Sequence, residues 1–177
     1  MNARNYVLDR PAGWSPDSAL TWSSGFLATL AISTTSYLLP AIGLPQVDLP
    51  VWVARLLVAD PVHVGAVGLA VHLVAGFTFA WLYVTQVEPR LTFGPGTSGL
   101  IFGAGLWFFV QTVAVPMLGA IGSVLGAVGG EPGLLSARFG VAAAGASLVA
   151  HLAYGGVLGY VYGCRGGGRC RRVREAG

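Results

Sequence analysis

The chain has 177 residues, and its composition is that of a membrane protein rather than of a soluble domain. Hydrophobic residues make up 54% of it and charged residues 10%, whereas soluble domains carry about 25% charged residues. The formal net charge of +3 comes largely from arginines near the C-terminus, so the basic balance does not indicate nucleic-acid binding. Residues 1–20 are polar and lack the apolar stretch of a cleaved signal peptide.

Four apolar runs without any Asp, Glu, Lys or Arg predict four transmembrane helices. Each run is about 20 residues long, and a helix of that length crosses a hydrocarbon core of about 30 Å. The runs are Trp22–Ile42, Val64–Thr85, Gly99–Ala120 and Val141–Gly163. We therefore expect an all-α fold, an integral membrane four-helix bundle over residues 22–163. A polar N-terminal segment, residues 1–21, precedes it, and a basic tail, residues 164–177, follows it.

The first and third runs each carry a proline and, three residues later, a glycine. These pairs are Pro40 with Gly43 and Pro116 with Gly119. Proline lacks a backbone N–H and its ring clashes with the preceding turn. Each run is therefore predicted to kink or end at this point.

A return segment with an acid, a proline and an arginine follows each of these runs. In the first, Pro50–Val58, apolar residues surround Trp52 and Arg55. This pattern predicts a short amphipathic interfacial helix with Trp52 at the lipid headgroups. The second return segment, from Glu131 to Arg138, contains fewer apolar residues but has the same order of acid, proline and arginine.

The second and fourth runs share one motif. It reads Leu69-x-x-His72-Leu73-x-x-Gly76 with Tyr83 in one, and Leu148-x-x-His151-Leu152-x-x-Gly155 with Tyr162 in the other. With the proline–glycine pairs, the motif predicts an internal duplication into repeat one, residues 22–85, and repeat two, residues 99–163. Both repeats run in the same direction, so a pseudo-twofold axis along the membrane normal would relate them.

The two histidines are the candidate functional residues, because an ionisable group inside a membrane span is costly to bury. In the interpretation we favour, they are structural. Gly76 and Gly155 then belong to small-residue packing stripes, and each imidazole bonds a polar group on the next helix. The residues expected to supply that group are Thr34, Thr35, Ser36 and Gln111.

Two alternatives assign the histidines a chemical role. His72 and His151 would ligate one b-type haem, with Gly76 and Gly155 leaving room for the macrocycle. Alternatively they would belong to a proton or ion path, which is disfavoured because no carboxylate lies within any run.

Arginine placement predicts the orientation. With four spans, one side holds Arg90 and the arginines of both terminal segments, whereas the other side holds only Arg55 and Arg138. The positive-inside rule then places both termini in the cytoplasm, most simply at a bacterial inner membrane. The tail arginines are expected to meet anionic lipid headgroups; they are Arg165, Arg169, Arg171, Arg172 and Arg174.

The end of the fourth run, His151 to Tyr162, reads His-Leu-x-Tyr-Gly-Gly-x-x-Gly-Tyr-x-Tyr. With the duplication around a return helix, it resembles small bacterial four-span membrane proteins of the YagU-like kind, whose function is unknown. The resemblance covers Trp22–Gly163 and implies a topology but no activity.

The sequence shows no catalytic triad order, zinc-protease motif, phosphate-binding loop or dinucleotide fingerprint, so we do not expect an enzyme. We expect a non-enzymatic accessory subunit of a larger membrane complex, respiratory or electron-transferring, without a cofactor of its own. Its partners would be the lipid bilayer and other membrane subunits. The alternatives are an electron carrier holding haem b between His72 and His151, and a small-solute or ion transporter.

Overall fold

The computed structural model describes residues 16–46, 48–58, 60–124, 126 and 133–166, and the regular elements within them are all helical. The predicted all-α fold is therefore confirmed for this part of the chain. The α-helices are α1 (Ser18–Leu38), α2 (Leu49–Leu57), α3 (Pro61–Leu82), α4 (Pro95–Phe109), α5 (Val115–Val124) and α6 (Val141–Gly166). Short 3-10 segments form η2 (Leu39–Ile42) and η5 (Leu134–Phe139), and π-helical turns form η3 (Tyr83–Val87) and η4 (Val110–Ala114).

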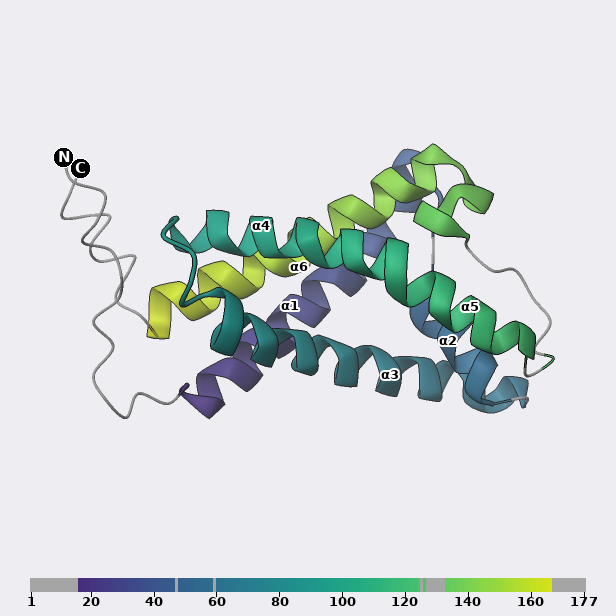
Figure 1. Ribbon diagram of the computed structural model, residues 1–177, viewed down its shortest axis with the longest axis horizontal. Coiled ribbons are helices and arrows are strands. Elements are labelled where there is room, and N and C mark those ends of the chain that lie inside the picture. Colours follow the sequence, from purple (N-terminus) through teal and green to yellow (C-terminus); the bar gives the residue numbers. More distant parts are fainter. Residues whose placement is uncertain (1–15, 47, 59, 125, 127–132, 167–177) are drawn as a thin grey trace.

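Four helical stretches are long and apolar enough to cross a membrane, as predicted. They are Ser18–Ile42, Pro61–Val87, Pro95–Val124 and Val141–Arg165. Successive stretches run in opposite directions (Figure 1). The connection between α3 and α4 lies at one end of the molecule, called here the turn end, and α2 lies at the other, called the α2 end.

Aspartates begin three of the helices. Asp17 accepts a hydrogen bond of 3.0 Å from the backbone N–H of Leu20 at the start of α1. Asp48 and Asp60 cap α2 and α3 in the same way, at 3.0 and 2.9 Å. A capping carboxylate pairs a backbone N–H that the helix leaves free. This explains why α1 begins at Ser18, ahead of the boundary expected at residue 22.

The C-terminal boundary also differs from the prediction, since α6 continues to Gly166. The first residues of the expected tail, including Arg165, are therefore helical. The other tail arginines lie outside the described residues; they are Arg169, Arg171, Arg172 and Arg174.

The two prolines of the odd spans behave differently. Pro40 lies in η2, which ends the first span at Gly43 with a φ of 83°, a left-handed conformation that glycine adopts without strain. Pro116 does not end a helix, because it lies within α5, which continues to Val124. The π-helical η4 comes directly before this proline, and such a wide turn is a regular way to relieve the ring's clash with the preceding carbonyl.

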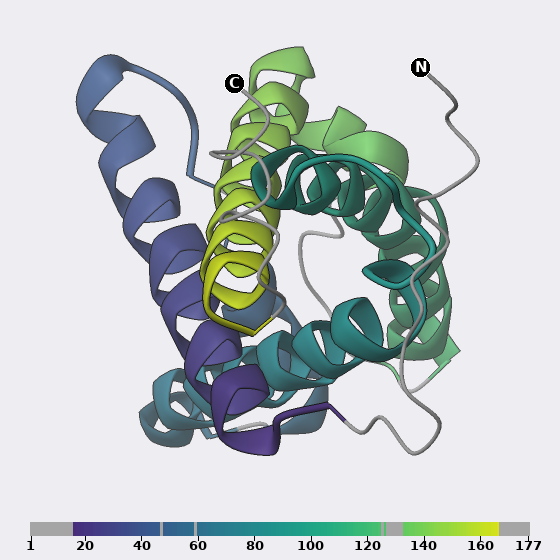
Figure 2. The same ribbon diagram turned by 90° about the vertical axis from the view of Figure 1, so that its left-hand side faces the viewer.

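The four long helices pack in the order α3, α1, α6, α4. Extensive contacts join α1 to α3, α1 to α6 and α4 to α6, and α2 packs against α3. In the part of the chain that the structure describes, no comparably extensive contact joins α3 to α4. Figure 2 looks along the helices and shows α3 and α4 on different flanks of the pair α1–α6.

The tightest of these contacts is between α4 and α6. A side chain added at Gly155 would collide with the backbone of Gly99 and Gly103, and one added at Gly159 would meet the Cα of Gly99 at 2.6 Å. Small residues four apart let two membrane helices approach to backbone contact. The Gly155-x-x-x-Gly159 stripe is thus a packing stripe, and its partner, Gly99-x-x-x-Gly103, was not singled out from the sequence.

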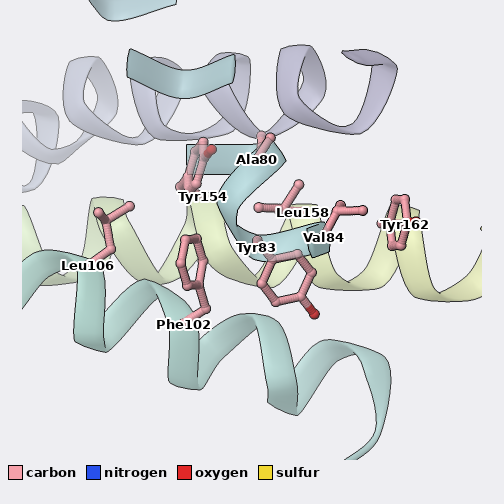
Figure 3. Packing of buried hydrophobic residues seen from close by; sticks show 9 residues of the cluster. Ala80, Tyr83, Val84, Phe102, Leu106, Tyr154, Leu158 and Tyr162 are labelled. Carbon is pink, nitrogen blue, oxygen red and sulfur yellow. The ribbon is translucent and has the colours of Figure 1, made fainter. Parts of the chain in front are cut away.

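A buried apolar cluster closes the turn end (Figure 3). The Tyr83 and Phe102 rings contact each other there, with centroids 5.1 Å apart, and so join η3 to α4. The cluster consists of Ala28, Ala80, Tyr83, Val84, Phe102, Leu106, Tyr154, Leu158 and Tyr162. The cluster draws residues from α1, α3, η3, α4 and α6 and so joins α3 to α4 at this end.

Candidate functional site: a cavity lined by two histidines

A cavity of about 180 Å³ lies among the helices next to the apolar cluster, and both candidate histidines line it. The lining comes from α1, α2, α3, α4, η4 and α6 and is mostly apolar. Its polar side chains are Thr29, Ser36, His72, Ser147, His151 and Tyr154. The structure therefore brings together the two residues that the shared motif singled out.

The cavity extends from the apolar cluster at the turn end to α2. Leu106 and Tyr154 belong both to its lining and to the apolar cluster at the turn end. At the other end α2 supplies lining residues. The backbones of α2 and α3 lie close together there, since a Cβ added at Gly68 would be 3.3 Å from the Pro50 carbonyl oxygen. Among the described residues, extensive contacts join α1 to α3, α1 to α6 and α4 to α6, whereas none of that extent joins α3 to α4 or η4.

His151 is buried, with 8% of its surface exposed. Its Nδ1 lies 2.8 Å from the backbone carbonyl oxygen of Ser147. A carbonyl oxygen only accepts hydrogen bonds, so Nδ1 carries the proton and donates it, and Nε2 of the neutral ring is left with an accepting lone pair. No group among the described residues bonds this Nε2.

His72 is held by α1 rather than by its own helix. Its Nε2 lies 3.0 Å from the hydroxyl oxygen of Ser33. Ser33 was not among the predicted partners. It is four residues after Thr29 and three before Ser36, which both line the cavity, so helical periodicity along α1 was the signal that would have found it.

Gln111 is fully buried in η4 and donates from Nε2 to the Ser147 hydroxyl at 2.9 Å. Gln111 therefore joins η4 to α6 through a serine, and not through a histidine as the sequence analysis expected. Ser147 thus accepts two hydrogen bonds, one from Gln111 at its hydroxyl and one from His151 at its backbone carbonyl. The wide turn of η4 and the His151 ring are positioned by the same residue.

Tyr154 crosses from one motif to the other. Its hydroxyl donates to the Gly76 carbonyl oxygen at 2.6 Å, in a buried setting. The bond joins α6 to α3 beside the cavity and holds the two histidine-bearing helices at a set separation.

The residues at the cavity do not fit a haem. A side chain added at Gly76 would collide with Thr29, and one at Gly155 with the backbone of α4, so neither glycine leaves space for a macrocycle. An apolar cavity of about 150 Å³ holds a single benzene ring, so about 180 Å³ is far too small for four linked pyrroles. In the described chain no three His, Cys, Asp or Glu residues gather as a metal site either.

The predicted surface residues have mixed positions. Trp52 is a buried residue with 8% exposure, because α2 lies against α3, and its indole N–H has no hydrogen-bond partner within the described ranges. It is therefore not presented on the protein surface as expected. Arg165 is exposed at the end of α6.

Comparison of the chain with family models, with curated proteins and with solved structures gives no match. The resemblance to YagU-like proteins therefore stays a prediction.

Proposed function

We propose that the chain is a non-enzymatic integral membrane subunit that docks into a larger membrane complex, one concerned with respiration or electron transfer. The repeats over residues 22–85 and 99–163, the interfacial position of α2 and the cytoplasmic location of both termini at a bacterial inner membrane belong to the same proposal. The arginine distribution of the sequence supports this orientation.

The observation that carries the proposal is a set of helix glycines without a neighbour. Gly65, Gly105 and Gly145 each lie beyond the first turn of a long helix, and an added Cβ would meet nothing within 4 Å. A glycine inside a helix costs about 1 kcal/mol relative to alanine, and in membrane helices close approach of another helix offsets this cost. Within the described residues no neighbour approaches these three positions, and a partner helix would.

Purification from native membranes in a mild detergent tests the proposal. We expect the chain to migrate in a complex with other integral subunits, including a redox-active one visible by its absorbance. Gly105→Leu should release the chain from that complex without unfolding it, since the new side chain enters open space.

The matched control is Val74→Leu, which enlarges an exposed side chain of α3 and should leave the complex intact. Recovery of the wild-type chain only as a monomer or homodimer would contradict the proposal. So would an intact complex with Gly65→Leu, Gly105→Leu and Gly145→Leu alike.

A further inference from the structure

We propose that the cavity between His72 and His151 binds the ring of a lipid-soluble aromatic alcohol, a phenol or a hydroquinone. In this complex the ligand's hydroxyl donates a hydrogen bond to Nε2 of His151. The inference goes beyond the proposed function, because it concerns a site within this chain and holds whether or not the chain joins a complex.

The first support is the unused nitrogen of His151. The ring is buried and lines the cavity, and its Nδ1–H is committed to the Ser147 carbonyl. An accepting nitrogen that faces an apolar cavity without a partner lacks the hydrogen bonds that it would make in water, which is costly. A ligand hydroxyl that reaches Nε2 removes this cost, whereas a ligand carbonyl, which can only accept, does not.

The second support is the size and character of the space. The cavity volume of about 180 Å³ matches one six-membered ring with small substituents. The lining is mainly aliphatic and aromatic, from residues such as Ile32, Val71 and Phe79. A few polar groups in an apolar cavity are typical of a small-molecule site.

The third support is the route of access. Among the described residues no extensive contact joins α3 to η4, which both line the cavity and belong to stretches long and apolar enough to span the bilayer. The ligand would therefore come from the lipid phase. A ring that is itself soluble in lipid meets this requirement, and a charged or strongly hydrated solute does not.

Binding of three molecules with the same methylated ring tests the inference. Duroquinol carries two hydroxyls, duroquinone two carbonyls, and durene neither. Titration calorimetry of the full chain in lipid nanodiscs, without oxygen, should give a dissociation constant roughly tenfold lower for duroquinol than for the other two. Equal binding of all three, or no binding of any, would overturn the proposal.

Variants locate the preference. His151→Leu should abolish the advantage of duroquinol while durene still binds, because the cavity keeps its apolar character. His63→Leu is the matched control, since His63 is exposed and its Nδ1 bonds Asp60 at 2.7 Å outside the cavity. Loss of the preference in His63→Leu, or its survival in His151→Leu, would contradict the assignment.

A second variant covers the case in which His151→Leu does not fold. Ala75 lines the cavity from α3, so Ala75→Leu should fill the space and weaken all three ligands without altering either histidine. Unchanged binding of duroquinol to Ala75→Leu would show that the ligand binds elsewhere.

Discussion

The contact between α1 and α3 and the contact between α4 and α6 bury the same motif in two different ways. Between α4 and α6, Gly155 meets backbone, and the helices touch along a line of glycines. Between α1 and α3, Gly76 meets the side chain of Thr29. In both places the glycine of the motif leaves space because it lacks a side chain. The neighbouring helix determines whether backbone or a side chain fills that space.

The histidines differ for the same reason. His151 lies beside a backbone-to-backbone contact, where its backbone faces Gly103, and its ring bonds its own helix at the Ser147 carbonyl. His72 faces α1, whose polar side chains reach it, and it bonds Ser33. One histidine is therefore left with an accepting nitrogen in the cavity, and the other is part of a helix–helix contact.

The largest effect is expected from filling the glycine contact of α6. Gly155→Leu drives a side chain into the α4 backbone, which cannot rotate away, so α4 and α6 must separate. Overpacking costs roughly 1–3 kcal/mol and sometimes more, and we expect Gly155→Leu to lower the free energy of unfolding by the upper end of this range or beyond. The measurement is SDS unfolding in mixed micelles, followed by circular dichroism. Gly145→Leu on the same helix meets open space and should cost little; equal losses in both variants would contradict the comparison.

The corresponding change on α3 should cost less. Gly76→Ala brings a methyl group against the Thr29 side chain, and a side chain yields more easily than backbone. We expect a loss of about 1–2 kcal/mol in the same assay. Combining it with Thr29→Ala should recover most of this loss, and a double variant no more stable than Gly76→Ala would show that backbone, not Thr29, is what the methyl meets.

The smallest effect concerns the hydrogen bond between His72 and Ser33. Single hydrogen bonds between membrane helices contribute about 0.6 kcal/mol on average, and glutamine keeps a donor and an acceptor at similar size. The free energy of unfolding of His72→Gln should therefore lie within about 0.5 kcal/mol of the wild-type value, whereas that of His72→Leu should be lower by about 0.6 kcal/mol. In a double-mutant cycle with Ser33→Ala, a coupling energy of zero would show that this hydrogen bond does not contribute to stability.

Sequence patterns were sufficient for the helices themselves because those patterns reflect local physics. Apolar runs without charge and the proline–glycine pair at Pro40 and Gly43 act within a few residues along the chain. They predicted four spans, and the spans are present with boundaries shifted by a few residues. Pro116 escaped the rule because a π-helical turn before it, which no local pattern announced, accommodates the ring.

What the sequence alone determined is thus an all-helical, four-span chain with two histidines inside its spans and small residues one turn away from each. Only the tertiary structure decided which groups of other helices these residues touch: Ser33 for His72, the Gly76 carbonyl for Tyr154, and one cavity shared by both histidines. The physical reason is that contacts between helices depend on which faces meet. An apolar run in a membrane protein is hydrophobic on every face, so its pattern does not record which face another helix will cover.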